Sequence, residues 1–274
     1  MRLNVQHATT YTYASPASSA IQILRLTPRN HDGQYVRHWR VEVDADYRLT
    51  RDEDPYGNIT HTFALEGPIT SMVVRVEGEV DTQDTHGIVA GTAERVPRRL
   101  WLRGTRLTEA DAALRRFAHE MAAGEGGATL PFLHRLNEVI CRDFEFVPGA
   151  TTTATTAAQC FANRRGVCQD LAQVYVSACR AMKIPARYVG GYFLRTDGFK
   201  QDAGHAWAEA YVEGIGWIGF DPAHGVCPTD RYVRVACGAD SADAAPIRGA
   251  RHGGRNEQMK VEIKVSAQRE LVED

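Results

Sequence analysis

The chain lacks several features that would point to particular classes of protein. Its 274 residues carry 32 basic and 34 acidic side chains, a formal net charge of −2. With no basic excess to meet a phosphate backbone, we expect no nucleic-acid partner. No apolar run approaches the roughly 18–20 residues that a membrane-spanning helix needs, so we expect no membrane partner either. Residues 1–13 have no signal-peptide pattern. We therefore expect a cytoplasmic protein.

The cysteines show no pairing pattern. There are six, at positions 141, 160, 168, 179, 227 and 237, with no CxxC and no regular spacing. Disulfide scaffolds are typical of short secreted chains, so free thiols fit better here. The missing CxxC pairs argue against a structural zinc site, and no segment resembles a calcium loop. We expect neither a metal nor a cofactor, and the sequence does not indicate an oligomeric state.

What is present is an ordinary globular composition, 43% hydrophobic and 24% charged. The first hundred residues are rich in strand formers, with turn signals between the strand-like segments. They hold no cluster of nucleophile, base and acid. We predict an N-terminal antiparallel β-sandwich domain over residues 1–100 that acts as scaffold. The strands expected are Arg2–Tyr13, Ile21–Leu26, Trp39–Val43 and Met72–Val80, and turns are expected at Asn30–Gly33, Asp54–Asn58 and Glu66–Pro68.

Helical periodicity begins after residue 107, and we predict a second domain over residues 101–274. Thr108 is the expected cap of its first helix, with Gly124–Gly127 ending it. Thr155 or Thr156 is the expected cap of a short later helix. The fold predicted is α+β, with helices packed on an antiparallel sheet. Further helices are expected at Phe132–Cys141 and Cys168–Met182, and strands at Ala186–Phe193, His205–Val212, Gly216–Asp221 and, at the C-terminal end, Met259–Val265.

Cys168 is the strongest candidate for a nucleophile. It follows Arg165-Gly166-Val167 directly and opens the most strongly patterned helix of the chain. The free N–H groups and the dipole of a helix N-terminus favour an anion, and the thiolate is the nucleophilic form of cysteine. The backbone N–H of Cys168 would also supply half of an oxyanion hole. The alternative is a buried structural cysteine, since free cysteines are commonly buried.

His205 and Asp221 are the candidate base and acid. His205 is flanked by small residues inside an apolar strand, where an unpartnered imidazole would be costly. Asp221 ends the next strand, and if the two strands form a hairpin around Gly214, the carboxylate comes close to the imidazole. It would then fix the tautomer of His205 and stabilise the imidazolium. Alternatively, Asp221 simply starts a turn before Pro222.

The motifs around these three residues resemble those of the bacterial transglutaminase-like superfamily. The resemblance implies a papain-like, transglutaminase-like core over about Thr108–Pro228 in which Cys168, His205 and Asp221 are nucleophile, base and orienting acid. The upstream region is similar to the N-terminal β domain that accompanies this core in bacterial members. The motifs are Gly166–Asp170, Ile184–Tyr192, Gly204–Trp207 and Gly216–Pro222, with Tyr11–Tyr13, Leu24–Arg29 and Asp54–Asn58 upstream.

Three further residues are weaker candidates. Gln159, nine residues before the nucleophile, is a candidate second oxyanion donor, because papain-like enzymes use an upstream glutamine; the alternative is a solvated glutamine near a helix cap. Trp207 and Tyr192 are candidate substrate-binding residues, although aromatic side chains on strands usually belong to the core. The sequence departs from many family members at Ala223-His224, where those carry Thr-Asn after the Asp-Pro pair.

These residues predict cysteine-dependent acyl transfer on amide bonds of peptides or proteins through a thioester. A protease, an amidase and a transamidase would share the triad, so the sequence does not choose between water and an amine as acceptor. Two alternatives remain open. One is a binding or scaffold protein that keeps the fold without turnover. The other is a zinc site on Cys168, His205 and Asp221, which no short ligand spacing supports.

Overall fold

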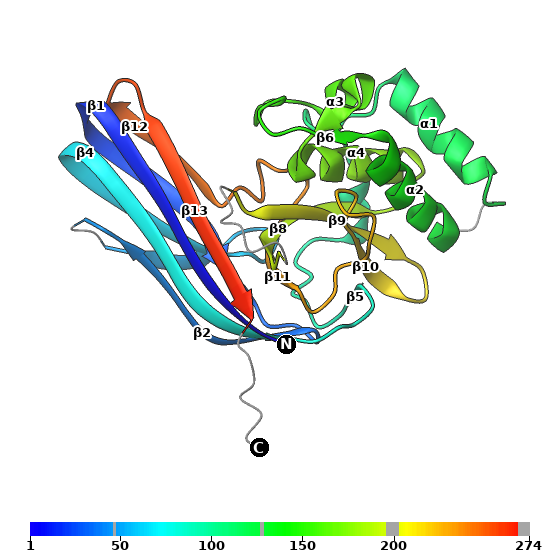
Figure 1. Ribbon diagram of the computed structural model, residues 1–274, viewed down its shortest axis with the longest axis horizontal. Coiled ribbons are helices and arrows are strands. Elements are labelled where there is room, and N and C mark those ends of the chain that lie inside the picture. Colours follow the sequence, from blue (N-terminus) through cyan, green and yellow to red (C-terminus); the bar gives the residue numbers. More distant parts are fainter. Residues whose placement is uncertain (46–47, 127–128, 196–202, 268–274) are drawn as a thin grey trace, which may run out of the picture.

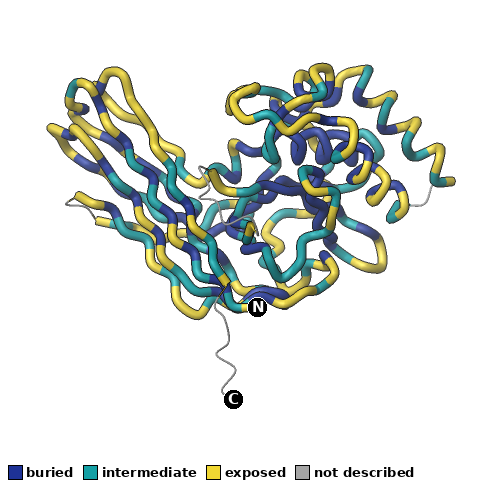
Figure 2. Tube along the Cα trace, viewed as in Figure 1, coloured by how far each residue is buried: buried dark blue, intermediate teal, exposed yellow. Residues whose placement is uncertain are grey.

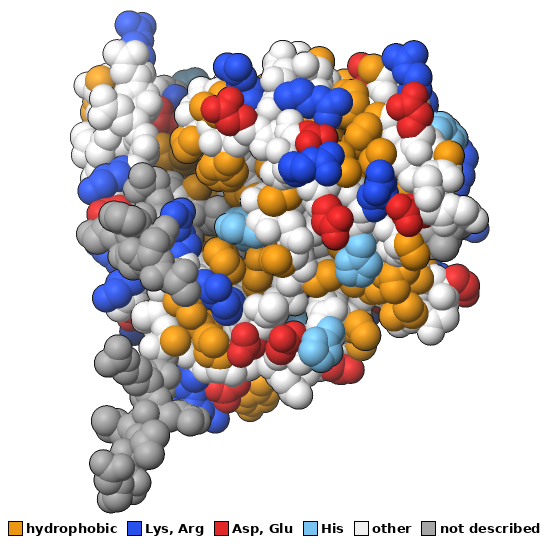
Figure 3. Space-filling view, turned by 45° about the vertical axis from the view of Figure 1, so that its right-hand side comes forward, with side chains coloured by type: hydrophobic (Ala, Val, Ile, Leu, Met, Phe, Trp, Pro, Cys, Tyr) orange, Lys and Arg blue, Asp and Glu red, His pale blue; other side chains and the backbone are white. Residues whose placement is uncertain are grey.

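The computed structural model describes residues 1–274 except 46–47, 127–128, 196–202 and 268–274. It confirms the α+β class. Figure 1 shows a strand-rich region on the left and, on the right, a second sheet covered by helices. Within the described residues, no helix is both long enough and apolar enough to cross a membrane. Figure 3 shows basic and acidic side chains interspersed on one face of the molecule.

Two long strands form the N-terminal region. Strand β1 spans Arg2–Thr27 and strand β4 spans Ile59–Thr82, and the two pair antiparallel along most of their lengths. The sequence predicts shorter strands separated by turns, with one turn at Glu66–Pro68. The structure instead carries β4 through this point, where the two backbones approach so closely that a Cβ on Gly67 would lie 2.3 Å from the carbonyl oxygen of Ala17. Strands β2 (Gln34–Val43) and β3 (Thr50–Glu53) pair with β4.

The two halves of these long strands pack on one another. Along residues 3–13 of β1, every second side chain is buried, which is the pattern of a strand with one face in a core. The first and second halves of both strands contribute to one hydrophobic cluster, so the bent sheet encloses its own core as a sandwich does. Its buried members include Tyr11, Tyr13, Leu24, Leu26, Phe63, Leu65, Met72 and Val74.

The C-terminal strands complete this sheet. Strands β12 (Ile247–Gly253) and β13 (Gln258–Ala267) both pair antiparallel with β1. The sequence predicts the final strand correctly but places it in the second domain. The structure puts it beside the first strand of the chain, where it supplies the backbone partners that an edge strand would otherwise lack. Figure 1 shows the red β13 lying along the blue β1.

The second sheet carries the candidate site. Its strand order is β11-β8-β9-β10-β5, and each neighbouring pair of strands is antiparallel. Strands β8 (Ala186–Phe193) and β9 (His205–Val212) lie where the sequence predicts them, and β10 (Gly216–Phe220) ends one residue earlier than expected. The outer strands are β5 (Ile88–Val89) and β11 (Tyr232–Gly238).

The α-helices cover one face of this sheet. They are α1 (Ala112–Ala123), α2 (Thr129–Asp143), α3 (Ala157–Asn163) and α4 (Cys168–Ala181), with the short strands β6 (Glu145–Phe146) and β7 (Arg165–Gly166) pairing in parallel between them. The 3-10 helix η1 (Arg98–Leu102) packs its Trp101 with Trp207 and Trp217 on the opposite face. Thr156 caps α3 as predicted. The expected cap at Thr108 is wrong: Asp111 caps α1 through the N–H of Leu114, whereas the Thr108 hydroxyl is buried against the guanidinium of Arg180. The C-cap of α1 is Gly124, and Gly127 lies outside the described residues.

The N-terminal sheet and the second sheet share a hydrophobic cluster. Leu3, Val5 and Val80 of the N-terminal sheet pack with Tyr188 and Val233 of the second, and Cys168 borders this cluster. Figure 2 shows buried positions concentrated in the second sheet and in α4. The N-terminal region therefore supports the sheet that carries His205 directly.

Candidate active site

Cys168 is the first residue of helix α4, as the sequence predicts. Val167 has an extended backbone, and its N–H donates to the Asp170 carboxylate at 2.9 Å. The Thr151 hydroxyl donates to the same carboxylate oxygen at 2.6 Å, so Asp170 fixes the helix entry from within the first turn. A Cβ on Gly166 would lie 2.7 Å from the Asp170 side chain. Only glycine fits this approach, which holds the partly buried Cys168 at the helix N-terminus.

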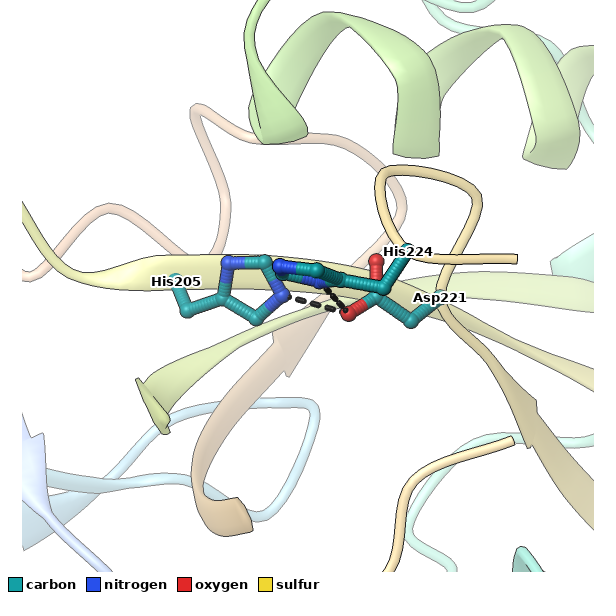
Figure 4. A group of neighbouring side chains, drawn as sticks. All are labelled: His205, Asp221 and His224. Atoms are coloured by element: carbon teal, nitrogen blue, oxygen red, sulfur yellow. Dashed lines mark hydrogen bonds and ion pairs between the residues drawn. The ribbon is translucent and has the colours of Figure 1, made fainter. Parts of the chain in front are cut away.

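Strand register brings His205 and Asp221 together. Strands β9 and β10 form the predicted hairpin, in which Ala208 lies opposite Phe220. Asp221 follows directly, and its Oδ2 lies 2.6 Å from His205 Nε2. Figure 4 shows the two side chains facing each other, with a third residue, His224, on the same carboxylate.

The Asp221 carboxylate is completely buried and receives several hydrogen bonds. His205 Nε2, His224 Nδ1 at 2.7 Å and the Tyr232 hydroxyl at 2.8 Å all donate to Oδ2. The backbone N–H of Ala223 donates to Oδ1 at 2.9 Å. Burial alone would raise the pKa of this carboxyl, but the bonds and charges of the two histidines hold it far below its usual range. Asp221 is therefore an anion across the physiological range of pH.

His205 is strongly buried, with 9% of its side chain exposed. Burial alone would lower its pKa. Hydrogen bonds to Asp221 and to Cys168, together with the charges of those groups, outweigh burial and raise the pKa of His205 to about 10. Because Asp221 engages Nε2, Nδ1 is the nitrogen left to face the thiol. The imidazole thus stands between Cys168 and Asp221 and favours its charged form.

The three weaker candidates lie in different settings, and their predicted roles stay predictions. Gln159 is exposed at the start of α3, where it forms a capping box with Thr156: its Oε1 accepts the Thr156 N–H at 2.9 Å. Among the described residues, no hydrogen bond or ring contact joins Gln159 to Cys168, His205 or Asp221, so its oxyanion role stays a prediction. Trp207 is 2% exposed and Tyr192 is 3% exposed. Trp207 lies 6.2 Å from the His205 ring centroid and supports it from the core, while the Tyr192 hydroxyl bonds His7 Nδ1 at 2.9 Å.

Two site residues were not expected from the sequence. Tyr232 donates to Asp221 from β11, and its ring lies 5.4 Å from that of Trp207. Nothing local in the sequence marks Tyr232, because the pairing of β11 with β8 brings it to the site. His224 did have a signal, the departure from the family pattern at Ala223-His224, but that departure did not indicate a contact with Asp221.

His205, Asp221 and His224 offer three potential metal-ligand atoms within 4.8 Å of one another. Ligands bound to zinc at about 2.0–2.1 Å in a tetrahedral arrangement lie more than 3 Å apart. The two nitrogens of this group lie only 2.6 and 2.7 Å from the Asp221 oxygen, which are hydrogen-bond lengths. The arrangement therefore fits protons shared between imidazoles and a carboxylate better than a metal ion.

The fold is that of the transglutaminase-like class. Residues 115–222 match the family model of the transglutaminase-like superfamily, and residues 3–81 match that of the bacterial transglutaminase-like N-terminal region. The chain belongs to this superfamily. Membership of this superfamily supports a cysteine-dependent activity of a general kind.

Relatives of similar length share both regions. An uncharacterized protein of Mycobacterium leprae is 28% identical over 97% of this chain and 98% of its own. An uncharacterized protein of Mycobacterium tuberculosis is 30% identical over 90% of this chain and 87% of its own. Among solved structures, a candidate cysteine protease of Cytophaga hutchinsonii superposes with a TM-score of 0.79 at 23% identity, covering 97% of this chain and 90% of that one. This last likeness concerns the fold.

Proposed function

We propose that the protein catalyses acyl transfer on amide bonds of peptides or proteins, with Cys168 as nucleophile, His205 as general acid and base, and Asp221 as the orienting acid. The observation that carries the proposal is the position of His205, whose Nε2 lies 2.6 Å from Asp221 Oδ2 and whose pKa is raised by both Asp221 and Cys168. Nucleophile, base and orienting group in this sequence of contacts are the arrangement that activates a thiol.

In the first step the Cys168 thiolate attacks the amide carbonyl carbon and forms the C–S bond. The negative charge passes to the carbonyl oxygen, and the backbone N–H of Cys168 at the start of α4 is suited to stabilise it. The C–N bond then breaks, and His205 gives its Nδ1 proton to the departing amine. A thioester on Cys168 and a neutral His205 remain.

In the second step water or an amine attacks the thioester. Neutral His205 takes the proton of the attacking group, the C–S bond breaks, and the thiolate and imidazolium are restored. Asp221 stabilises the imidazolium and keeps Nδ1 turned towards the sulfur throughout. Water as acceptor gives hydrolysis or deamidation, and an amine gives transamidation.

The proposal is tested by incubating peptide libraries with the wild-type protein and with Cys168→Ala, each with and without a primary amine. Mass spectrometry distinguishes cleavage, deamidation of glutamine and amine incorporation. We expect one of these products with the wild type and none with the variant. Equal product with both proteins would contradict a role for Cys168. Absence of product from both would favour a binding or scaffold protein that keeps this fold without turnover.

A further inference from the structure

His224 occupies an unusual place in the candidate site. It lies on the turn after β10, three residues beyond Asp221, and its Nδ1 contacts the same carboxylate oxygen that holds His205. The His224 side chain is 44% exposed, and its ring centroid lies 5.1 Å from that of His205. One buried carboxylate oxygen is thus shared by a buried histidine and an exposed one, as Figure 4 shows.

We propose that His224 is a positioning residue that acts on His205 through Asp221, sharing the carboxylate oxygen and thereby setting how strongly Asp221 holds the imidazolium. This inference rests on the proposed function for its effect on turnover, but the coupling between the two histidines is a property of the metal-free chain that can be measured without a substrate.

The geometry fixes the hydrogen-bonding roles. Because Asp221 is an anion, it accepts at Oδ2, so both His205 Nε2 and His224 Nδ1 carry protons. Both bonds end on the same charged oxygen and are therefore charge-assisted. The bond from His224 draws on the oxygen that holds the imidazolium of His205, so it weakens the hold of Asp221 on His205.

Other groups around His224 set the background for this coupling. Tyr232 on β11 donates to the same oxygen. Cys141 on α2 lies next to the turn, with its Sγ 3.9 Å from the carbonyl oxygen of Ala223. The ring of Phe193 on β8 is tilted against that of His224, with centroids 4.8 Å apart. Arg231 lies over the Phe193 ring, 5.0 Å from its centroid.

The first measurement follows His205 by NMR of nitrogen-15-labelled histidine in full-length Cys168→Ala protein, which removes the thiol from the titration. We expect the His205 titration midpoint to shift in His224→Ala, which removes the contact with Asp221 Oδ2. In His224→Asn, whose amide N–H can still donate to Asp221, the midpoint should stay near that of the protein with His224.

A permanent charge gives the second comparison. His224→Arg should lower the His205 titration midpoint by about one pH unit relative to His224→Asn. His119→Arg, at an exposed position on α1, should leave it unchanged. If His205 titrates identically in the Ala, Asn and Arg variants, the proposal is wrong. If the Arg variant does not fold, the comparison of the Ala and Asn variants decides alone.

Turnover supplies the third measurement, on the peptide substrates found with the wild type. His224→Ala should lower kcat about tenfold or more with little change in KM, because it frees the carboxylate that orients His205. His224→Asn should restore most of the loss. A change confined to KM, or no rescue by asparagine, would contradict a positioning role. If the wild type has no activity that Cys168→Ala lacks, the proposed function fails, while the NMR result still decides the coupling.

Discussion

His205 Nε2 and Asp221 Oδ2 lie 2.6 Å apart although sixteen residues separate them in the chain. The hairpin of β9 and β10 makes this contact, because its register sets Ala208 against Phe220 and leaves the acid just beyond the last pair. The pKa of His205 is raised and that of Asp221 lowered by the same contact. The β9–β10 hairpin thus favours a positive imidazolium at His205 and a negative carboxylate at Asp221.

Selective alkylation tests the reactivity of Cys168. Near pH 6 we expect iodoacetamide to modify Cys168 well ahead of the other cysteines, because an imidazolium lies against it. Cys141 and Cys227 are the matched controls: both are also partly buried, and burial raises the pKa of each thiol. Peptide mapping by mass spectrometry gives the order of labelling. Equal labelling of Cys168 and these two would argue against an activated thiol.

Removing the charge of Asp221 should impair catalysis far more than folding. Asp221→Asn keeps the size of the side chain but no longer stabilises the imidazolium, and its amide can stabilise the wrong tautomer of His205. We expect kcat to fall by roughly 10³–10⁴-fold, the scale seen when an orienting acid becomes an amide. Steady-state kinetics measure this. A loss below about tenfold would mean that Asp221 serves only the turn before Pro222.

The stability of the protein should depend on pH through His205. Its pKa in the folded state is about 10, above the value of 6.5 in an unfolded chain. The stabilisation is therefore complete below about pH 6.5 and is lost as pH rises through 10, with a slope of at most about 1.4 kcal/mol per pH unit. Urea unfolding of wild type and His205→Asn between pH 6.5 and 10 measures it. The difference between the two free energies of unfolding should shrink with rising pH; a constant difference would refute the assignment.

The contact between the two sheets should weaken in acid. His7 of β1 is buried against Tyr192 of β8, and burial lowers the pKa of His7 to about 4. A lowered histidine pKa means that stability is lost as pH falls from about 6.5 towards 4, because the unfolded chain binds the proton more readily. His7→Asn should remove this part of the acid dependence, measured by urea unfolding at pH 7 and pH 5. Tyr192→Phe should destabilise by about 1–3 kcal/mol, through the unpaired His7 nitrogen.

Gly191, opposite His205 in the β8–β9 pair, should not tolerate a side chain. A Cβ there would lie 2.1 Å from the carbonyl oxygen of Val233 and 2.9 Å from the Trp207 ring. We expect Gly191→Ala to destabilise by about 1–3 kcal/mol and to displace the strand beside His205. Gly124→Ala is the control, since the nearest contact of its Cβ is an ordinary 3.5 Å. Thermal unfolding of both variants would show whether only the first is affected.

Local patterns in the sequence were enough to place the three central residues. A glycine before a patterned helix located Cys168 at its start, and two apolar segments around Gly214 predicted the hairpin that joins His205 to Asp221. The pairing of the last strand with the first could not be predicted, because no local signal says which edge a strand will join. The same holds for Tyr232, which reaches the site through the pairing of β11 with β8.

Some errors have a local physical cause. Thr108 has the chemistry of a helix cap, but its hydroxyl bonds the buried Arg180, and Asp111 takes the capping role instead. The turn predicted at Glu66–Pro68 lies inside β4, and the gap predicted between Tyr13 and Ile21 lies inside β1. Both strands run through these points, with shifts in their pairing register near Ala17.

The central claim is that Cys168 carries the acyl group as a thioester, and trapping that adduct tests it most directly. A substrate peptide from the library is mixed with the wild-type protein, the reaction is quenched in acid, and intact-mass and peptide-map mass spectrometry locate any added acyl group. We predict an adduct on Cys168 that hydroxylamine removes. In the His205→Asn variant, loaded with an activated ester, the adduct should accumulate because the base that activates the acceptor is missing. Product formation with no adduct on Cys168, or with the adduct on another residue, would contradict the account.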